Sequence, residues 1–194
     1  MKVILKPGAI VVLAAILATL LVLVALRRGA TDAGSKSAAD PARGGLLTPL
    51  FFPYRMMKDD TGATEEEIPS VVVNGSPTVL LRATVKHPSQ NSWDVQAGMP
   101  MGVSVAAGER FDFIVWARSR TKSRASFQFQ QTKQPYTHFL ERTETLTPEW
   151  KRYHYVFSVP KAFPVTETSA VLFFGQDAGE IEVALPSVTR VAAR

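Results

Sequence analysis

Alternation of apolar and polar side chains constrains this chain more than any other feature of its sequence. In residues 110–118, every second side chain from Phe111 to Ala117 is apolar. The same period of two recurs in three further runs, at residues 125–130, 153–157 and 181–185. This is the period of a β-strand that buries one face. Helical periodicity is nearly absent after Ile68, so the sequence predicts an all-β fold for that part of the chain.

Short runs rich in β-branched and aromatic residues are separated by Gly, Pro, Asn and Ser, which are turn formers. The runs lie at residues 71–73, 78–85, 93–96, 102–105, 110–118, 125–130, 153–159, 169–174, 181–185 and 188–191. A single sheet of this size would leave its inner face uncovered, so two packed sheets are expected. We therefore predict a β-sandwich over residues 68–194, preceded by a leading segment at residues 49–67.

A continuous apolar run extends from Ala9 to Leu26, with no charge and one polar side chain among its eighteen residues. As a helix it would span about 27 Å, close to the thickness of the hydrocarbon core of a bilayer. Three interpretations remain open: an uncleaved transmembrane anchor, a cleaved signal peptide and a buried core helix. We favour the anchor, because Arg27 and Arg28 follow without a small-residue cleavage site and because the run is apolar all round.

The segments before and after this apolar run indicate how it is connected to the folded domain. Residues 1–8 form a short flank, and residues 27–48 are a flexible tether rich in Gly, Ala, Ser and Pro. Residues 46–54 (LLTPLFFPY) are interpreted as an edge strand or a segment lying against the domain, with a membrane-interface or partner-docking segment as the alternative. We expect a single-pass membrane protein with a periplasmic or extracellular C-terminal domain, although basic residues at both ends of the run leave the orientation open.

Charge and cysteine content exclude several function classes. Of the net charge of +5, residues 1–63 carry +4 and residues 64–194 carry +1. A nearly neutral domain argues against a nucleic-acid partner bound through a broad basic face. Without cysteine there is no disulfide and no thiolate chemistry. One basic cluster is interpreted as a solvated hairpin tip, with an acidic-glycan contact as the alternative; it comprises Arg118, Arg120, Lys122 and Arg124.

Catalytic and metal-binding patterns are missing from the sequence. His87, His138 and His154 lack the spacing of metal ligands, and no nucleophile elbow, phosphate loop or dinucleotide fingerprint occurs. Four glutamates could in principle pair as in glycoside hydrolysis, namely Glu141, Glu144, Glu149 and Glu182. The sequence places them on loops or singly on strands, so we expect a protein that is not an enzyme.

The polar faces of the predicted strands carry amide, imidazole, guanidinium and aromatic groups. A sugar offers hydroxyls around its ring plane and C–H groups on its faces, so a sugar site combines aromatic platforms with planar polar groups. Eight residues have this chemistry and are our candidate ligand-binding residues: Trp93, Gln96, Trp116, Arg118, Gln128, Gln130, Tyr136 and His138. A solvated strand face, or a tryptophan in the core, is the alternative for each of them.

An ordered set of motifs lies between Val79 and Val191: LLRATV, WDVQ, VAAGERFDFIVWARS, LTPEWKRYHYVFSVP and VLFFGQDAGEIEVALPSV. In this order they resemble the carbohydrate-binding modules appended to bacterial xylanases and cellulases, which are galactose-binding-like jelly rolls. The resemblance covers about 113 of the 194 residues. It implies a jelly-roll β-sandwich that binds sugar on one concave sheet face without catalysis.

The resemblance also implies roles for individual residues. Trp93 and Gln96 match the family's W-x-x-Q motif, whose tryptophan and glutamine contact the glycan. Tyr136 matches the aromatic residue that faces them, and Gln128 and Gln130 lie on the strand that lines the cleft.

One departure concerns a metal. In the family, an Asp-Asn pair on the closing strand helps to hold a structural calcium, and Pro186-Ser187 stands in that place here. We therefore expect no cofactor and no structural calcium.

The sequence thus favours a membrane-anchored, non-catalytic module that binds a polysaccharide or glycoconjugate in the cell envelope. The alternative is a protein-interaction or structural module of an envelope assembly that uses the same β-sandwich without sugar. Exposure of Trp93 and Tyr136 around one groove would favour the first hypothesis, and burial of both would favour the second.

Overall fold

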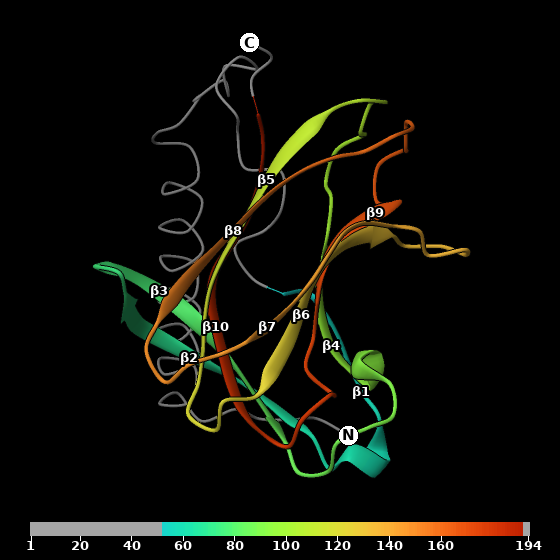
Figure 1. Cartoon of the computed structure of the whole chain (residues 1–194). Helices are drawn as coiled ribbons and strands as arrows, with labels where there is room; N and C mark the ends of the chain where they lie inside the picture. The colour runs from blue at the N-terminus through green and yellow to red at the C-terminus, as the bar shows by residue number, and fades with distance from the viewer. Residues whose placement is uncertain (1–51, 192–194) are drawn as a thin grey trace, which may run out of the picture. The chain divides into compact units, whose positions relative to one another are not determined.

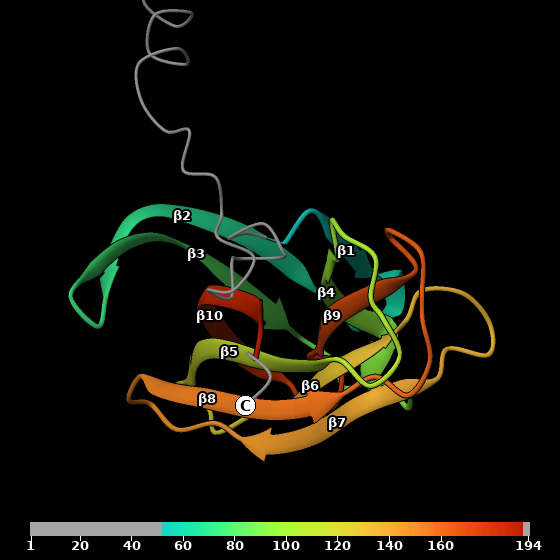
Figure 2. The same cartoon turned by 90° about the horizontal axis from the view of Figure 1, so that it is seen from above.

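The computed structural model describes residues 52–191, so the apolar run at residues 9–26 and the tether at residues 27–48 lie outside the described part. The described residues form ten strands and two short 3-10 helices. Figures 1 and 2 show the strands as two layers, each a five-stranded antiparallel sheet. The all-β, two-sheet architecture predicted from the sequence is confirmed. Within residues 52–191, no helix has the length and apolar character that crossing a membrane requires.

The two sheets are called the front sheet and the back sheet. The front sheet has the order β1-β4-β9-β6-β7, with β1 (Tyr54–Met57), β4 (Val95–Pro100), β9 (Thr168–Phe173), β6 (Arg124–Gln131) and β7 (His138–Thr145). The back sheet has the order β2-β3-β10-β5-β8, with β2 (Thr64–Val73), β3 (Ser76–Val85), β10 (Gly179–Arg190), β5 (Arg110–Ser119) and β8 (Lys151–Ser158). The 3-10 helices are η1 (Asp59–Thr61) and η2 (Ser92–Asp94).

The core lies between the sheets and is built by the alternation seen in the sequence. Phe111 of the back sheet and Phe129 of the front sheet are fully buried, with their ring centroids 6.1 Å apart. Phe157 packs against both rings, at 5.6 Å from Phe111 and 4.6 Å from Phe129. Aromatic rings at these separations attract one another beyond the burial of their area. The inward positions predicted for these strands are therefore confirmed.

The sandwich begins earlier than the expected boundary at Ile68. Strand β1 pairs with β4 from Tyr54 onward, and β2 pairs with β3 from Thr64 onward. Both pairings are antiparallel and add the outermost strand at one edge of each sheet. The leading segment therefore contributes to both layers.

Several strand predictions differ from the structure. The run at residues 93–96 is not one strand, because Trp93 and Asp94 belong to η2 and β4 begins only at Val95. Residues 138–145 form β7, although the sequence suggested a loop, because this edge strand buries only Leu140 completely and shows little alternation. Residues 102–105 are not a strand and form only an isolated bridge from Val105 to Phe163. The runs at 181–185 and 188–191 belong to β10, interrupted by a bulge at Leu185-Pro186, where proline has no N–H to donate.

Candidate functional site

A cleft of about 680 Å³ opens on the outer face of the front sheet. The strand register brings its floor together from four strands. Val171 of β9 pairs with Gly98 of β4 on one side and with Gln128 of β6 on the other. Gln128 in turn pairs with Glu141 of β7. Because side chains alternate between faces, these residues share the face opposite the phenylalanine core. Residues distant in sequence thus form one continuous surface.

The cleft contains six of the eight candidate ligand-binding residues. They are Trp93, Gln96, Gln128, Gln130, Tyr136 and His138. The structure therefore brings together the tryptophan and glutamine of the W-x-x-Q motif, the glutamines of β6 and the two residues at the β6–β7 connection. Their role in binding stays a prediction.

Aromatic side chains border the cleft from three different elements. Trp93 stands on η2 and is 50% exposed, Tyr136 stands between β6 and β7 and is 49% exposed, and Tyr54 of β1 is half exposed as well. Phe173 and Val171 form a buried apolar floor. Half-exposed rings around an apolar floor suit a ligand that has apolar faces and polar edges.

Gly98 gives the Tyr54 ring its place beside the floor. The two residues are paired across β1 and β4. A Cβ added at Gly98 would lie 3.3 Å from Cδ1 of Tyr54, which is closer than most carbon atoms pack. The absence of a side chain at Gly98 therefore lets the tyrosine ring approach the sheet.

Hydrogen bonds fix the amides of the cleft. The Nε2 group of Gln96 donates to the carbonyl oxygen of Trp93 at 2.9 Å, which ties β4 to η2. The Nε2 group of Gln128 donates to Oε1 of Glu141 at 3.4 Å, and Nδ1 of His138 lies 3.1 Å from Oε2 of the same carboxylate. Glu141 thus contacts two candidate residues at once.

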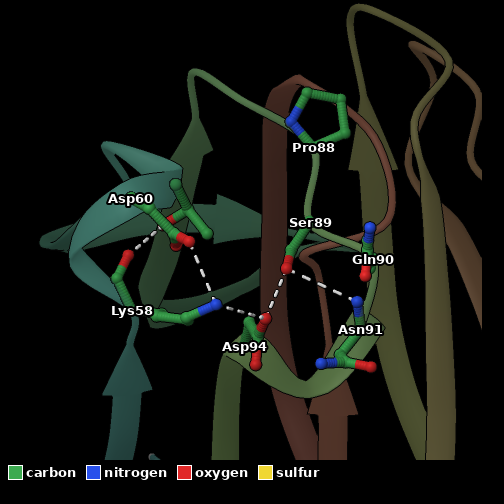
Figure 3. A pocket seen from close by; sticks show the side chains of 8 residues that line it. Lys58, Asp60, Pro88, Ser89, Gln90, Asn91 and Asp94 are labelled. Atoms are coloured by element: carbon green, nitrogen blue, oxygen red, sulfur yellow. Dashed lines mark hydrogen bonds and ion pairs between the residues drawn. The ribbon is translucent and has the colours of Figure 1, made fainter.

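A second, polar pocket of about 330 Å³ is lined by residues of η1, of the 88–91 loop and of η2 (Figure 3). Its buried carboxylate, Asp94, accepts a short hydrogen bond from the Ser89 hydroxyl and lies 3.5 Å from Nζ of Lys58. These two interactions outweigh the effect of burial and hold the pKa of Asp94 below its ordinary value. Lys58 also pairs with Asp60 at 3.0 Å. The network anchors η2, the element that carries Trp93.

Trp116 and Arg118 are not in the cleft, contrary to the sequence-based selection. Both stand on β5 and face outward from the back sheet, the opposite layer of the sandwich. Trp116 packs in a separate apolar cluster around Leu80 and Ala184. Alternation along a strand tells which residues share a face, but it does not tell to which sheet the strand belongs. This is why these two residues were grouped with the others.

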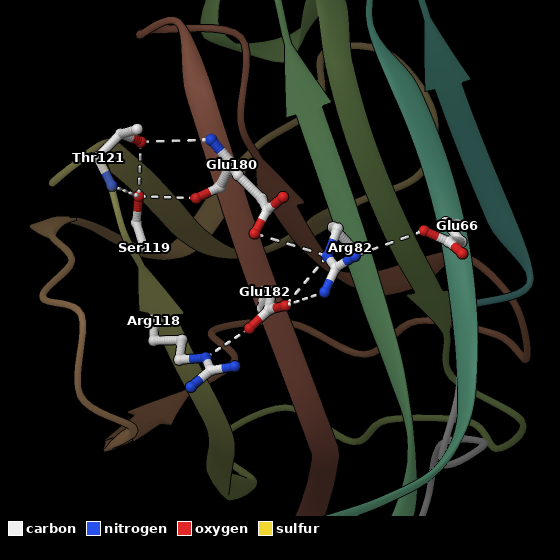
Figure 4. A network of polar contacts seen from close by, with 7 residues as sticks. All are labelled: Glu66, Arg82, Arg118, Ser119, Thr121, Glu180 and Glu182. Carbon is white, nitrogen blue, oxygen red and sulfur yellow. Dashed lines mark hydrogen bonds and ion pairs between the residues drawn. The ribbon is translucent and has the colours of Figure 1, made fainter.

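Arg118 has a structural partner in the back sheet (Figure 4). Glu182 of β10 is 2% exposed and lies between Arg118 and Arg82, with Nη2 of Arg82 at 2.7 Å. Burial alone would raise the pKa of Glu182, but hydrogen bonds from Arg82 and Arg118 outweigh it and lower that pKa. The Arg118 guanidinium also lies 4.7 Å from the ring centroid of Trp150. These contacts account for Arg118 without a ligand.

The rest of the basic cluster is also away from the cleft. Arg124 pairs with Asp177 at 2.7 Å, and Arg120 and Lys122 are exposed on the β5–β6 turn. None of these side chains lines the cleft. The β5–β6 connection is not a hairpin tip, because β5 belongs to the back sheet and β6 to the front sheet, although Arg120 and Lys122 on it are exposed to solvent as interpreted.

Sequence reasoning missed Tyr54 and Glu141 as residues of the site. Tyr54 ends the aromatic segment LLTPLFFPY, which was recognised as unusual but not connected to the strand that carries Gln96. Glu141 was considered only as a possible catalytic carboxylate on a loop. Its position directly opposite Gln128 follows from β7, which the sequence did not predict.

No family model matches the sequence, and no curated protein matches it. Solved structures do match the fold. One, described as "CBM4 structure and function", superposes with a TM-score of 0.57 at 17% identity, covering 81% of this chain and 92% of that chain.

Two further structures superpose at similar quality. The second N-terminal cellulose-binding domain of β-1,4-glucanase C from Cellulomonas fimi gives a TM-score of 0.51 at 19% identity, covering 78% of this chain and 97% of its own. The apo form of CBM1 from BiXyn10A gives 0.52 at 11% identity, with 77% and 98% covered. The domain has the fold of a carbohydrate-binding module. At these identities, the likeness concerns the fold of the module and not its ligand.

Proposed function

We propose that residues 52–191 form a non-catalytic module that binds one chain of a polysaccharide or glycoconjugate in the front-sheet cleft. The observation that carries the proposal is the exposure of Trp93 and Tyr136 at one groove, since the exposed aromatic side chains among the described residues, these two and Tyr54, all line it. Such rings bind the C–H faces of sugars, while Gln96, Gln128 and Gln130 are suited to hydroxyls. The shared fold supports the proposal, as one matching structure is a cellulose-binding domain.

The carboxylates of the domain support binding without cleavage. Glycoside hydrolysis usually needs two carboxyl groups on either side of the scissile bond. Among the described residues that line the cleft, Glu141 is the only carboxylate. Glu144 accepts a hydrogen bond from the Tyr155 hydroxyl at 3.1 Å, and Glu182 lies in the back sheet between two arginines.

We further propose that the apolar run at residues 9–26 anchors the protein as a single-pass membrane helix. The tether at residues 27–48 would then present the module on the periplasmic or extracellular side, within reach of envelope glycans. If so, the full-length protein stays with the membrane fraction after a carbonate wash, since a helix in lipid is not released by salt or alkali. A soluble product that begins near residue 40 would indicate a cleaved signal peptide instead.

The binding proposal is tested by calorimetric titration of the full-length protein in a zwitterionic detergent that has no sugar headgroup. The ligands are soluble xylan, mixed-linkage β-glucan and a uronic-acid polymer. Gln96→Ala should weaken binding by roughly 2- to 13-fold, because a typical hydrogen bond contributes about 0.5–1.5 kcal/mol. Trp93→Ala should weaken binding more and leave the circular dichroism spectrum unchanged, since half of its side chain is already in solvent.

Arg152→Ala is the matched control, because Arg152 is an exposed residue of β8 on the back sheet. It should bind like the wild-type protein. Absence of heat with every glycan, together with unfolding of Trp93→Ala, would contradict a sugar site.

One observation favours the alternative of a protein-interaction module in an envelope assembly. The outer face of the back sheet carries the second apolar cluster, in which Ile68, Trp116 and Leu185 are partly exposed. Partly exposed apolar side chains that cluster on a sheet are typical of interaction surfaces. If no glycan binds and Trp116→Ala abolishes association with an envelope protein, this alternative replaces the glycan proposal.

A further inference from the structure

The negative charge of the cleft, in the part of the chain that the structure describes, comes from a single side chain, Glu141. Among the described residues that line the cleft, Glu141 is the only carboxylate and no lysine or arginine is present. Two basic residues that adjoin lining residues in the sequence have their side chains engaged in other contacts. Nζ of Lys133 pairs with Glu167 at 2.7 Å, and Nη1 of Arg142 donates to the backbone carbonyl oxygen of Glu141 at 2.7 Å. The only other titratable groups on the lining are the imidazole of His138 and the hydroxyls of Tyr54 and Tyr136.

Glu141 also sets the orientation of the neighbouring amide. A carboxylate only accepts hydrogen bonds, so Gln128 must turn its Nε2 group toward Glu141. Its Oε1 atom then has no hydrogen-bond partner among the described residues, although Gln128 is 2% exposed. This oxygen is covered in the free protein, so a ligand hydroxyl could donate to it only after a side-chain movement, whereas an anionic oxygen would gain no hydrogen bond from such a movement.

We infer that Glu141 is a specificity-determining residue that makes the front-sheet cleft select neutral glycan chains with free hydroxyls and reject chains of uronic acids. This inference rests on the proposed glycan-binding function. An anionic sugar placed over Val171 would lie beside the carboxylate with no cation on the lining to balance it. Repulsion of this kind discriminates between ligands of the same shape without any new attractive contact. The basic cluster on the β5–β6 turn cannot compensate, since it does not line the cleft.

The test uses two ligands that differ only in charge: the β-1,4-linked glucose hexamer and the β-1,4-linked glucuronic acid hexamer. The full-length protein is titrated with each in a zwitterionic detergent at pH 8. The wild-type protein should bind the neutral hexamer about fivefold more tightly than the acidic one, because the Glu141 side chain is 58% exposed and like charges about 4 Å apart then repel nearly as they do in water.

Glu141→Gln keeps the shape of the side chain and an oxygen that can accept from Gln128. Whatever its affinity for the neutral hexamer, it should reduce the ratio of the two affinities at least about threefold, because the charge beside the acidic ligand is lost. Glu149→Gln is the matched control, as Glu149 is an exposed carboxylate outside the cleft, and it should leave both affinities unchanged. Thermal melts establish that both variants are folded.

A salt series on the wild-type protein repeats the test without a substitution. Discrimination should shrink as sodium chloride rises to about 0.5 M, where charges are screened within about 4 Å. The role of Glu141 would be overturned if the neutral hexamer binds but the ratio of the two affinities stays the same in Glu141→Gln or at high salt. That outcome would leave glycan binding itself intact. A wild-type preference for the acidic hexamer would overturn it too. Binding of neither hexamer would contradict the proposed function itself.

Discussion

Glu65 offers a quantitative test of how the β1 edge of the sandwich is packed. It lies on β2 opposite Ala83, on the inward face, and its side chain is 1% exposed. Neither of its carboxylate oxygens has a hydrogen bond among the described residues. The nearest charge is Nε of Arg55 at 3.6 Å, and that guanidinium is already bound to Glu67. Burial therefore raises the pKa of Glu65 to about 7, with only partial compensation by Arg55.

This pKa fixes the sign and size of the effect of Glu65→Gln. A carboxyl group with a pKa of 4.5 when unfolded and about 7 when folded binds its proton more tightly in the native state. The native state is therefore not penalised below pH 4.5, and it loses stability as the pH rises toward and through 7. The full difference corresponds to about 3 kcal/mol, since a tenfold change in a proton affinity is worth about 1.4 kcal/mol. Glutamine stays neutral and avoids this penalty.

Urea denaturation at pH 4.5 and at pH 8 measures the effect. Glu65→Gln should match the wild-type free energy of unfolding at pH 4.5 and exceed it by up to about 3 kcal/mol at pH 8. Glu66→Gln is the control, because Glu66 is the exposed neighbour on the same strand, and its effect should stay within about 0.5 kcal/mol at both pH values. If Glu65→Gln were less stable than the wild-type protein at pH 8, the ion pair with Arg55 would be net favourable and the argument from burial would be wrong.

Three further substitutions test the core, the back sheet and the cleft. Phe157→Ala should destabilise the domain by about 3–5 kcal/mol in urea denaturation, since the ring packs between Phe111 and Phe129. Glu182→Gln should lower the free energy of unfolding at pH 7 by about 2–3 kcal/mol, because two arginines lose their buried charged partner, although both still reach water. In the wild-type protein, the stability contributed by ionised Glu182 is present above pH 4.5 and is lost as the pH falls through the lowered pKa of Glu182. Gly98→Ala should change the melting temperature by less than about 4 °C but weaken glycan binding in calorimetry, because its Cβ displaces the Tyr54 ring; unchanged binding would show that Tyr54 does not contact the ligand.

The inward faces of the strands could be predicted because alternation is a local property. Phe111, Phe113 and Val115 are separated by one residue each, and an extended backbone must put them on the same side. All three are fully buried. The same reasoning separated Phe127 from Gln128 correctly. Local patterns suffice wherever a strand has one apolar and one polar face.

Strand β7 could not be predicted because its sequence, HFLERTET, lacks that contrast. It is the edge of the front sheet, paired only with β6, so just Leu140 is completely buried and polar residues occupy both faces. An edge strand gains its conformation from the ladder beside it rather than from its own composition. Because β7 was not predicted, Glu141 was not recognised as a residue of the cleft. Its position opposite Gln128 follows only from the pairing of β6 with β7.

The sheet to which each strand belongs is a non-local property. It determines which of the candidate ligand-binding residues lie together in the cleft. Trp116 on β5 and Gln128 on β6 are joined by one short turn, yet they end on opposite layers because the chain crosses from the back sheet to the front sheet between them. A period of two describes both strands equally well. The tryptophan and glutamine of W-x-x-Q, which both line the cleft, were selected by the ordered motifs of a resemblance and not by periodicity.

The first strand shows most clearly that the cleft is a consequence of sheet order. Strand β1 closes the edge of the front sheet beside β4, where it places Tyr54 over Gly98 and Met56 beside Gln96. Sδ of Met56 lies 3.8 Å from Nε2 of Gln96, the amide that holds the carbonyl of Trp93. A chain that began at the predicted boundary of Ile68 would keep the W-x-x-Q motif but would lack the strand that supports it. Strand β1 is therefore part of the architecture of the cleft, since it completes one side of it with Tyr54 and leaves β4 paired along both of its edges.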